Sequence, residues 1–205
     1  SIVVSALINP RPTATASITS QNICSSNSIT DITLSSTVTG TTFNWTRNNT
    51  VNVIGISNNG SGDISGSLVN ITNTTQTVIF TITPTANGCN GTNITASVVV
   101  YPIPVLSSSA PNQTRCSGVA LGSFGISSNV SGTTYSWTRD NTTNVFGPTN
   151  GTSGTITVGN TFSLSHILTN NTTSAQTVVY TFTPTSTDGC VGDPITSTVI
   201  LNVPS

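Results

Sequence analysis

The amino-acid sequence predicts an all-β protein made of two tandem β-sandwich domains. The first observation is an internal repeat, because residues 40–49 read GTTFNWTRNN and residues 132–141 read GTTYSWTRDN. Self-similarity at a fixed spacing is the signature of one folded unit copied in tandem. The second is that short runs alternate apolar and polar residues, which is typical of strands with one buried face. The third is length, because 205 residues fit two domains that can each bury a core.

The repeat extends along nearly the whole chain. Matching residues lie 92 positions apart in the first part of each copy: Cys24 and Cys116, Trp45 and Trp137, Arg47 and Arg139, Gly55 and Gly147, Gly62 and Gly154. Further on, QTVIFTITPT (76–85) returns as QTVVYTFTPT (176–185) at an offset of 100, and GCNG (88–91) returns as GCVG (189–192). The larger offset places an insertion at about 157–170, which we interpret as an added strand or an extended hairpin.

Proline-ended β-rich runs mark the expected domain boundaries. Such a run occurs at 95–104 and again at 196–205, and the opening residues 1–12 have the same pattern. We therefore interpret 1–12 as the last strand of a preceding repeat or a linker, 13–104 as the first repeat and 105–205 as the second. Proline cannot donate to a sheet ladder, so it ends a strand and stiffens the join that follows. The joins are predicted at the Pro-x-Pro pairs Pro10, Pro12, Pro102 and Pro104.

Within a repeat, the strands are predicted from period-two alternation. Residues 30–36 place Ile32 and Leu34 on one face, residues 42–47 place Phe43 and Trp45 on one face, and 78–83 has a long apolar side. Spacing of this kind, with turn signals every 8–12 residues, indicates a sandwich. The turn signals are Asn-Gly at 59–60, 87–88 and 150–151 and Asp-Gly at 188–189, which predict turns or tight hairpins.

Charge and hydropathy exclude several partners. The chain has no Lys, Glu or Met, and its four Arg and five Asp give a net charge of −1. Binding of nucleic acid or anionic lipid needs basic clusters, so neither is expected. No apolar run reaches the roughly 18 residues that indicate a membrane span. The absence of an initiator Met and of a signal peptide suggests an excised or mature segment.

The four cysteines occur as two per repeat, at matching places: Cys24, Cys89, Cys116 and Cys190. Zinc sites usually contain close-set pairs such as CxxC, and none occurs, so no metal is predicted. The favoured interpretation is one disulfide inside each repeat, Cys24–Cys89 and Cys116–Cys190. Two reduced buried pairs are the alternative, and pairing across repeats is the least favoured because each unit should fold alone. Disulfides imply an oxidising, extracytoplasmic compartment.

The two tryptophans, Trp45 and Trp137, each follow an aromatic residue two positions earlier. They could form a sugar-stacking platform, but aromatics make up only 5% of the chain, which favours a structural core role. His166 is the only histidine and lies in the insertion, far from any acid in the sequence. Because a catalytic histidine needs a nucleophile and an orienting acid, no enzyme activity is predicted.

The acidic residues and the sequons carry weak signals. The five Asp are isolated: Asp31, Asp63, Asp140, Asp188 and Asp193. Calcium sites usually cluster carboxylates, so only Asp188 and Asp193, around the GCVG turn, remain a minor candidate. Sequons such as Asn44, Asn70, Asn73 and Asn141 are expected by chance in a chain this rich in Asn and Thr.

A family resemblance follows from the order of these motifs. Each copy contains Cys-Ser-Gly/Ser (24–26, 116–118), then GTTF/Y-x-WTR, a Gly-Ser-Gly/Thr-Ser-Gly turn (60–62, 152–154), QTV-x-aromatic-T-x-TPT and GC-x-G. This order, from about residue 10 to 205, resembles the PKD-like repeats of Bacteroidetes cell-surface proteins. The resemblance implies immunoglobulin-like sandwiches in long tandem arrays. Such arrays are common in large adhesins exported by the type IX pathway, including gliding-motility adhesins of the SprB kind.

These observations together predict a non-catalytic structural segment of an extracellular, cell-surface adhesin that acts as a rigid stalk. Neighbouring repeats of the same chain are the expected partners, and no cofactor is expected. One alternative is a module that weakly binds a polysaccharide or a solid surface and gains avidity from many copies. The other is a spacer in a secreted enzyme.

Overall fold

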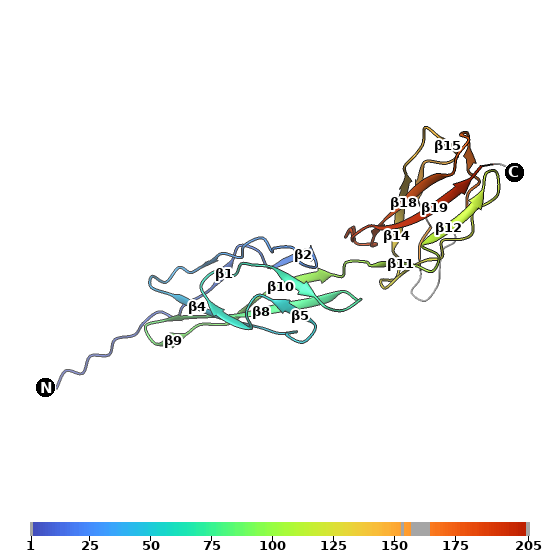
Figure 1. Ribbon diagram of the computed structural model, residues 1–205. Helices are drawn as coiled ribbons and strands as arrows, with labels where there is room; N and C mark the ends of the chain where they lie inside the picture. Colours follow the sequence, from blue (N-terminus) through green and yellow to red (C-terminus); the bar gives the residue numbers. More distant parts are fainter. Residues whose placement is uncertain (1, 153, 157–164, 204–205) are drawn as a thin grey trace. The chain divides into compact units, whose positions relative to one another are not determined.

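The computed structural model describes residues 2–152, 154–156 and 165–203, and the chain divides into two compact units, Ser1–Pro102 and Ile103–Ser205. Every regular element among these described residues is a β-strand, 19 in all (Figure 1). The all-β fold predicted from the sequence is therefore confirmed.

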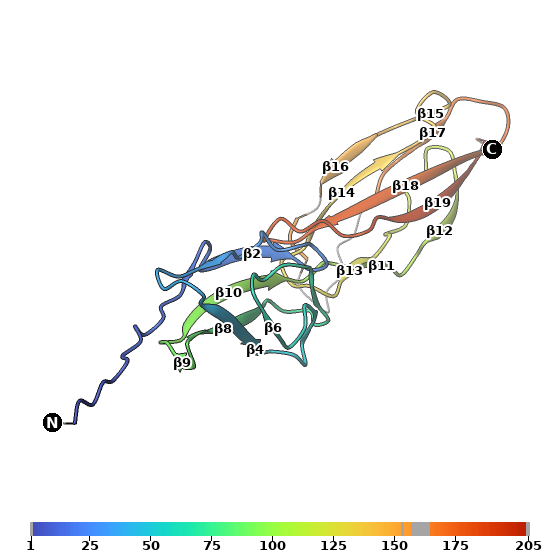
Figure 2. The ribbon, with the colours of Figure 1, turned by 90° about the vertical axis from the view of Figure 1, so that its left-hand side faces the viewer.

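The first unit is a sandwich of one large sheet and a second layer of short strands (Figure 2). The large sheet has the order β2 (Ser20–Cys24), β10 (Ile94–Tyr101), β8 (Gln76–Ala86), β4 (Thr42–Arg47) and β6 (Asn59–Ser61), and β9 (Cys89–Asn90) also pairs with β8. The second layer pairs β1 (Thr15–Ala16) with β3 (Leu34–Ser35) and β5 (Val53–Gly55) with β7 (Leu68–Asn70). A bridge between Ile32 and Ile64 lies between these two pairs. The β2–β10 pairing is parallel and the other strand pairings are antiparallel.

The second unit repeats this plan. Its large sheet has the order β12 (Asn112–Cys116), β19 (Ile195–Asn202), β18 (Gln176–Thr185), β14 (Thr134–Arg139) and β16 (Asn150–Thr152). Its second layer pairs β11 (Leu106–Ser108) with β13 (Ile126–Ser128), and β15 (Val145–Phe146) with β17 (Thr169–Asn170). The parallel pairing returns between β12 and β19.

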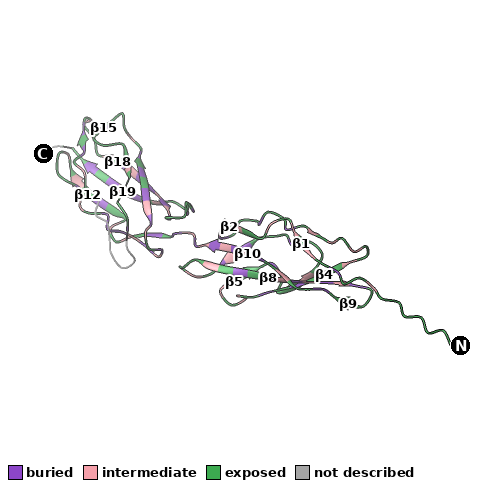
Figure 3. Cartoon of the chain, turned by 180° about the vertical axis from the view of Figure 1, so that it is seen from behind, coloured by how far each residue is buried: buried purple, intermediate pink, exposed green. Residues whose placement is uncertain are grey.

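Each unit has its own core, which lies between the two layers. In β8, Val78, Phe80 and Ile82 are fully buried while Ile79 between them is 39% exposed. This is the alternation expected of a strand with one buried face, and Figure 3 shows buried and exposed residues alternating along the long strands. Residues of both layers, such as Phe80 in the large sheet and Leu68 in the second layer, belong to the same cluster. The second unit has an equivalent core that contains more aromatic rings.

The chain enters and leaves each unit at opposite ends. Strand β8 has 11 residues, so its ends lie roughly 33 Å apart at about 3.3 Å per residue. The incoming chain at Pro12 lies at the Ala86 end. A Cβ on Gly91 would overlap the Pro12 carbonyl oxygen, and Gly91 directly follows β9, which pairs with the Ala86 end of β8. The outgoing strand β10 ends at the other end, where Val100 pairs with Gln76. We call these the proximal and the distal end of a unit.

The turn predictions had mixed outcomes. Asn87-Gly88 is a tight two-residue hairpin, since Ala86 pairs with Cys89 and both loop residues have positive φ. In contrast, Asn59-Gly60 and Asn150-Gly151 lie within β6 and β16. The glycines there face a tryptophan ring of the neighbouring strand. Glycine is therefore needed to leave room for the ring, and these two pairs do not form turns.

Two further expectations concern the ends and the insertion. Described residues 2–14 include no strand, so the opening residues do not form a strand within this chain. In the insertion expected at 157–170, residues 157–164 lie outside the described part of the chain. Its described end contains β17, which pairs with β15 as β7 pairs with β5.

Candidate functional site

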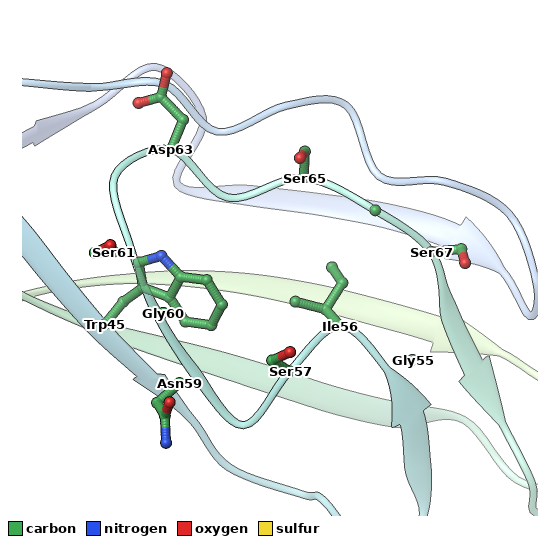
Figure 4. A pocket seen from close by; sticks show the side chains of 11 residues that line it. Trp45, Gly55, Ile56, Ser57, Asn59, Gly60, Ser61, Asp63, Ser65 and Ser67 are labelled. Carbon is green, nitrogen blue, oxygen red and sulfur yellow. The ribbon is translucent and has the colours of Figure 1, made fainter.

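The first unit has an open hollow of about 570 Å³ beside Trp45 (Figure 4). Its wall is mostly small and polar, formed by the loop after β5, by β6 and by the segment before β7. The lining residues are Trp45, Gly55, Ile56, Ser57, Asn59, Gly60, Ser61, Asp63, Ser65, Gly66 and Ser67. This hollow was not expected from the sequence.

Trp45 forms the floor of the hollow and belongs to the core. The side chain is 7% exposed, and its ring meets Phe80 edge to face at a centroid distance of 5.6 Å. A Cβ on Gly60 would overlap the indole carbon Cζ2, so β6 can cross the ring only with glycine there. Trp137 is 4% exposed in the second core, and Gly151 lies over it in the same way. Both tryptophans therefore lie in the core.

In the second unit a histidine occupies the place that corresponds to Gly66. The carbonyl of Gly66 accepts a hydrogen bond from Ile29 N at 2.8 Å, and the carbonyl of His166 accepts one from the repeat-equivalent Leu121 N at 2.7 Å. The His166 ring packs on Trp137 at a centroid distance of 4.6 Å, and its Nδ1 lies 3.3 Å from the Tyr180 hydroxyl. The imidazole therefore covers Trp137, whereas the equivalent Trp45 of the first unit lies beside an open hollow.

The surroundings of His166 favour its neutral form. Burial lowers its pKa below the ordinary 6.5, and the positive charge of Arg139 lowers it further. Burial also raises the pKa of Tyr180 to about 12, although Arg139 acts in the opposite direction. Trp137 and Tyr180 are structural neighbours, so the described contacts of His166 include none of the groups that a catalytic triad requires.

A buried arginine holds the β5 or β15 segment against the sheet in each unit. Arg47 is 8% exposed and donates from Nε to the Ile56 carbonyl at 2.7 Å and from Nη1 to the Val53 carbonyl at 3.0 Å. Burial lowers the pKa of Arg47. Arg139 is 6% exposed and donates to the Pro148 and Val145 carbonyls at 2.7 and 2.8 Å. The arginine of the WTR motif therefore connects this segment to the large sheet through side-chain hydrogen bonds to its backbone carbonyls.

Sequence reasoning did not predict this arginine role, although a signal was present. Two of only four arginines stand at the same place in the repeat, two residues after the core tryptophan. Side chains two residues apart on a strand share a face, so Arg47 and Arg139 had to point inward. The pattern was available, but its meaning depended on carbonyl groups whose positions the sequence does not reveal.

Several weak sequence candidates have structural functions. The Asp63 and Asp140 carboxylates accept hydrogen bonds from Leu34 N and Val179 N. The sequon residue Asn70 is 7% exposed and donates to the Val100 carbonyl, and Asn141 donates to the Thr177 carbonyl.

The remaining sequence candidates lie on the surface. Asn44 and Asn73 are exposed, as are Asp31, Asp188 and Asp193. Within the described ranges, there is no group of three or more His, Cys, Asp or Glu that could hold a metal ion. A search of the same residues found no helix with the length and apolar character needed to cross a membrane.

The structure contradicts disulfides within each repeat. Cys24 pairs with Tyr101 at the distal end of the first unit, whereas Cys89 pairs with Ala86 at the proximal end. These ends are roughly 33 Å apart, and the Cα atoms of a disulfide usually lie about 4.4–6.8 Å apart. In the second unit, Cys116 pairs with Asn202 at the distal end, whereas Cys190 lies at the proximal end beside Ser186. The predicted pairs Cys24–Cys89 and Cys116–Cys190 are therefore wrong.

The bonding states of the cysteines agree with this separation. Cys24 and Cys190 are disulfide-bonded. Cys89 and Cys116 have free, exposed thiols. Each unit thus contributes one bonded and one free cysteine, and the free one is at the proximal end of the first unit but at the distal end of the second.

The proline joins lie next to the proximal cysteines. A Cβ on Gly192 would overlap the Pro104 carbonyl oxygen, as a Cβ on Gly91 would overlap that of Pro12. The second glycine of each GC-x-G motif therefore lets the incoming chain cross the turn that carries the cysteine. Pro12, Pro102 and Pro104 are buried, whereas Pro10 is exposed.

These features define a protein of two tandem immunoglobulin-like β-sandwiches. The PKD-like domain family matches residues 21–104 and 113–204, and the chain belongs to this family. No curated protein matches it.

Among solved structures, the chain is similar to "DIP-gamma IG1+IG2" at 9% identity, covering 96% of this chain and 99% of that one, with a TM-score of 0.43. It is also similar to the fibronectin(III)-like modules of Clostridium thermocellum CbhA, at 9% identity, 93% and 95% coverage and a TM-score of 0.35. A protein of unknown function from Porphyromonas gingivalis W83 matches at 9% identity, 92% and 99% coverage and a TM-score of 0.35.

Proposed function

We propose that this chain is a non-catalytic stalk segment of a large extracellular bacterial adhesin. The observation that carries the proposal is that the chain enters each unit at one end and leaves at the opposite end, roughly 33 Å away along strands such as β8. A unit threaded in this way adds length with every copy. Tandem PKD-like domains often serve as extracellular adhesion or spacer modules, which is consistent with this role.

The surface and the joins support the same role. Outward positions are mostly Ser, Thr and Asn, and the net charge is −1, so the repeats have little electrostatic attraction for one another or for charged polymers. Prolines at each join restrict the backbone. A disulfide-bonded protein suits the oxidising extracellular space.

The finer assignment follows from the resemblance of the repeat motifs. We propose that the parent protein is a cell-surface adhesin of the gliding-motility kind exported by the type IX pathway. The test is to raise antibodies against this fragment and label intact cells of the species that produces it. Gold particles standing away from the cell envelope, and lost when the pathway is disrupted, are the expected result. Label confined to broken cells would overturn the assignment.

The hollow beside Trp45 favours a second candidate, weak binding of a polysaccharide by the first unit. Its volume of about 570 Å³ suits one or two sugar rings, and its rim presents hydroxyl and amide groups from Ser57, Asn59 and Ser61. Such a site would act through many copies of a weak contact. The second unit differs because His166 packs on the corresponding tryptophan.

The two tryptophans allow a direct test of this candidate. Each unit contains one, so the two indole N–H resonances report on the two units separately. Saturable shifts of the Trp45 resonance with soluble oligosaccharides, but not of the Trp137 resonance, are expected for a sugar site in the hollow. The substitution Ser61→Tyr should remove them, and Thr152→Tyr, at the matching place in β16, should not. If millimolar sugar does not shift the Trp45 resonance, the sugar site is contradicted and only the stalk role remains.

A further inference from the structure

The hollow beside Trp45 has a neighbour on the other side of β6. This second open hollow, of about 440 Å³, lies on the outer face of the large sheet, where β8, β4 and β6 run side by side. The two hollows share the residues Trp45, Asn59, Gly60 and Ser61. They therefore border each other at β6, within the first unit.

Gly60 explains why the two hollows meet at this strand. A Cβ on Gly60 would overlap the indole carbon Cζ2 of Trp45, so β6 crosses the ring as bare backbone. Because no side chain stands between the strand and the ring, the indole forms part of the wall of both hollows.

The indole nitrogen of Trp45 lacks an acceptor. The residue is 7% exposed, and within the described part of the chain its buried Nε1 has no hydrogen-bond partner. Figure 4 shows this nitrogen on the side of the ring toward Ser61. A buried N–H without an acceptor costs about 1–3 kcal/mol, and a ligand that supplies an oxygen removes that cost. Strand β6 has a single neighbour in the sheet, β4, so it can move by the small amount that access to Nε1 requires.

Two rows of polar side chains lead from β6 across the outer face of the sheet. Residues that pair directly across antiparallel strands share a face, with Cβ atoms about 4.5–5.5 Å apart. Among the described residues, these six side chains make no hydrogen bond to another residue, so their hydroxyl and amide groups are available to a ligand. The rows are Asn59–Thr46–Thr81 and Ser61–Asn44–Thr83.

The walls of both hollows are nearly uncharged. Asp63 is the one charged residue among the described residues that line either hollow, and its Oδ1 accepts a hydrogen bond from Leu34 N at 2.8 Å. With no basic side chain in the lining, nothing offsets the repulsion between this carboxylate and an anionic polymer. The lining therefore favours a neutral ligand rich in hydroxyl groups.

The second unit repeats the rows but covers the ring, so it serves as an internal control. His166 packs on Trp137 at a centroid distance of 4.6 Å. Access to the tryptophan is thus the main difference between the two faces. The matching rows are Asn150–Thr138–Thr181 and Thr152–Ser136–Thr183.

We propose that the two hollows of the first unit are adjoining subsites of one groove, which binds a linear, neutral polysaccharide whose chain crosses β6 at Gly60. One sugar ring packs its C–H face on Trp45, whose π-face is negative, and offers an oxygen to Nε1. The next rings follow the polar rows over β4 and β8. The inference rests on the proposed sugar binding by the first unit, and it adds the second subsite, the path of the chain and the class of sugar.

A series of chain lengths tests the number of subsites. The probes are cello-, chito-, xylo- and manno-oligosaccharides, each from the single sugar to the tetramer, and the readout is the Trp45 indole resonance. In a series that binds, we expect the tetramer to bind about tenfold more tightly than the single sugar, because it fills both hollows. The Trp137 resonance should not shift. Equal affinity for the single sugar and the tetramer would overturn the groove and retain a single sugar site.

An isosteric substitution tests the path over the outer face. Thr81→Val combined with Thr83→Val removes two hydroxyl groups and keeps a good β-former at both positions. The tetramer should bind about tenfold more weakly, which corresponds to the loss of one or two hydrogen bonds, and the affinity for the single sugar should not change. Thr181→Val with Thr183→Val, at the matching places in the second unit, should change neither affinity. An unchanged affinity of the first variant for the tetramer would overturn the proposed path.

Charged oligomers test the class of sugar. Oligogalacturonates should bind more weakly than neutral oligomers of the same length, and Asp63→Asn should reduce the difference, since its amide oxygen still accepts from Leu34 N. Oligogalacturonates that bind as tightly as neutral oligomers would overturn the neutral class.

The groove and the stalk fail in different ways. If no series shifts the Trp45 resonance at millimolar concentration, the groove and the sugar site are both overturned, and the stalk is untouched because it does not depend on Trp45. Length-dependent binding by a protein that is absent from the cell surface would retain the groove and remove the adhesin assignment.

Discussion

The two units share a frame but differ beside the core tryptophan. Both use a glycine from the neighbouring strand over the ring and a buried arginine two residues further on. In the first unit Gly66 leaves a hollow beside Trp45, whereas in the second His166 packs on Trp137. The comparison indicates that the arginine and the glycine maintain the fold, whereas the position of Gly66 and His166 tolerates change because it lies at the rim of the core.

A second difference lies in the aromatic content of the cores. The second unit has Phe124 and Phe182 where the repeat places Ile32 and Ile82 in the first, and both phenylalanines are fully buried. Phe124 lies 5.4 Å from Phe182 and 5.0 Å from Tyr180, measured between ring centroids. The same sheet register therefore accommodates two different packings, since each repeat adjusts both layers together.

Loss of the buried arginine should have the largest effect in both units. Arg47→Met or Arg139→Met keeps apolar volume but leaves buried carbonyl groups without a donor, so we expect a loss of about 3 kcal/mol in the free energy of unfolding of that unit. The measurement is urea unfolding followed by the indole resonance of the same unit. Arg115→Met, at a partly exposed site, is the control. Equal effects of all three variants would contradict the structural role.

Adding a methyl group over the tryptophan should be the next most harmful change. Gly60→Ala and Gly151→Ala each place a Cβ against the indole, so β6 or β16 must shift, at a cost of about 2 kcal/mol. Ser61→Ala, next to Gly60 and exposed, should leave stability unchanged. Thermal unfolding by calorimetry checks both. A neutral Gly60→Ala would show that the strand position is adjustable.

Removing the histidine should make the second unit resemble the first. His166→Ala removes the ring contacts with Trp137 and Tyr180, for an expected loss of about 1 kcal/mol. Trp137 should then become accessible to a fluorescence quencher such as acrylamide. Ile167→Ala, which truncates a side chain 58% exposed, is the matched control. Unchanged quenching of His166→Ala would mean that the imidazole does not shield the ring.

The smallest predicted effect is a pH dependence confined to the second unit. In the folded protein the pKa of His166 lies below its ordinary value of 6.5. The unfolded chain therefore binds the proton more readily. Stability is therefore full above about pH 6.5 and falls as the pH drops through 6.5 towards the folded pKa. The first unit has no histidine and should show no change over this range. His166→Gln should abolish the effect, and its persistence in that variant would assign it to another group.

The long strands could be predicted because their alternation is strong. The run at 42–47 matches β4, and the run at 78–83 lies inside β8, with the expected faces buried. Both tryptophans lie in the core as predicted. In these segments, the side-chain period directly sets which face is buried.

The cysteine pairing could not be predicted, because it depends on strand direction and length. A spacing in sequence does not reveal that Cys24 and Cys89 lie at opposite ends of one sheet; the parallel pairing of β2 with β10 decides this. The Asn-Gly pairs in β6 and β16 were wrongly predicted to form turns for a related reason. A glycine that makes room for a ring across the sheet and a glycine that makes a turn look the same in the sequence.

The central claim is that the chain enters a unit at one end and leaves it at the other, and the free thiol of Cys89 allows a direct test. Spin labels on Cys89 and on the cysteine of a Thr75→Cys variant, in a Cys116→Ser background, mark the proximal and the distal end of the first unit, because Thr75 is exposed and directly precedes β8. The account predicts a mean distance of about 35 Å by pulsed electron paramagnetic resonance, from about 3.3 Å per residue along β8. A distance below about 20 Å would mean that the two positions lie at the same end of the unit, and would contradict the stalk.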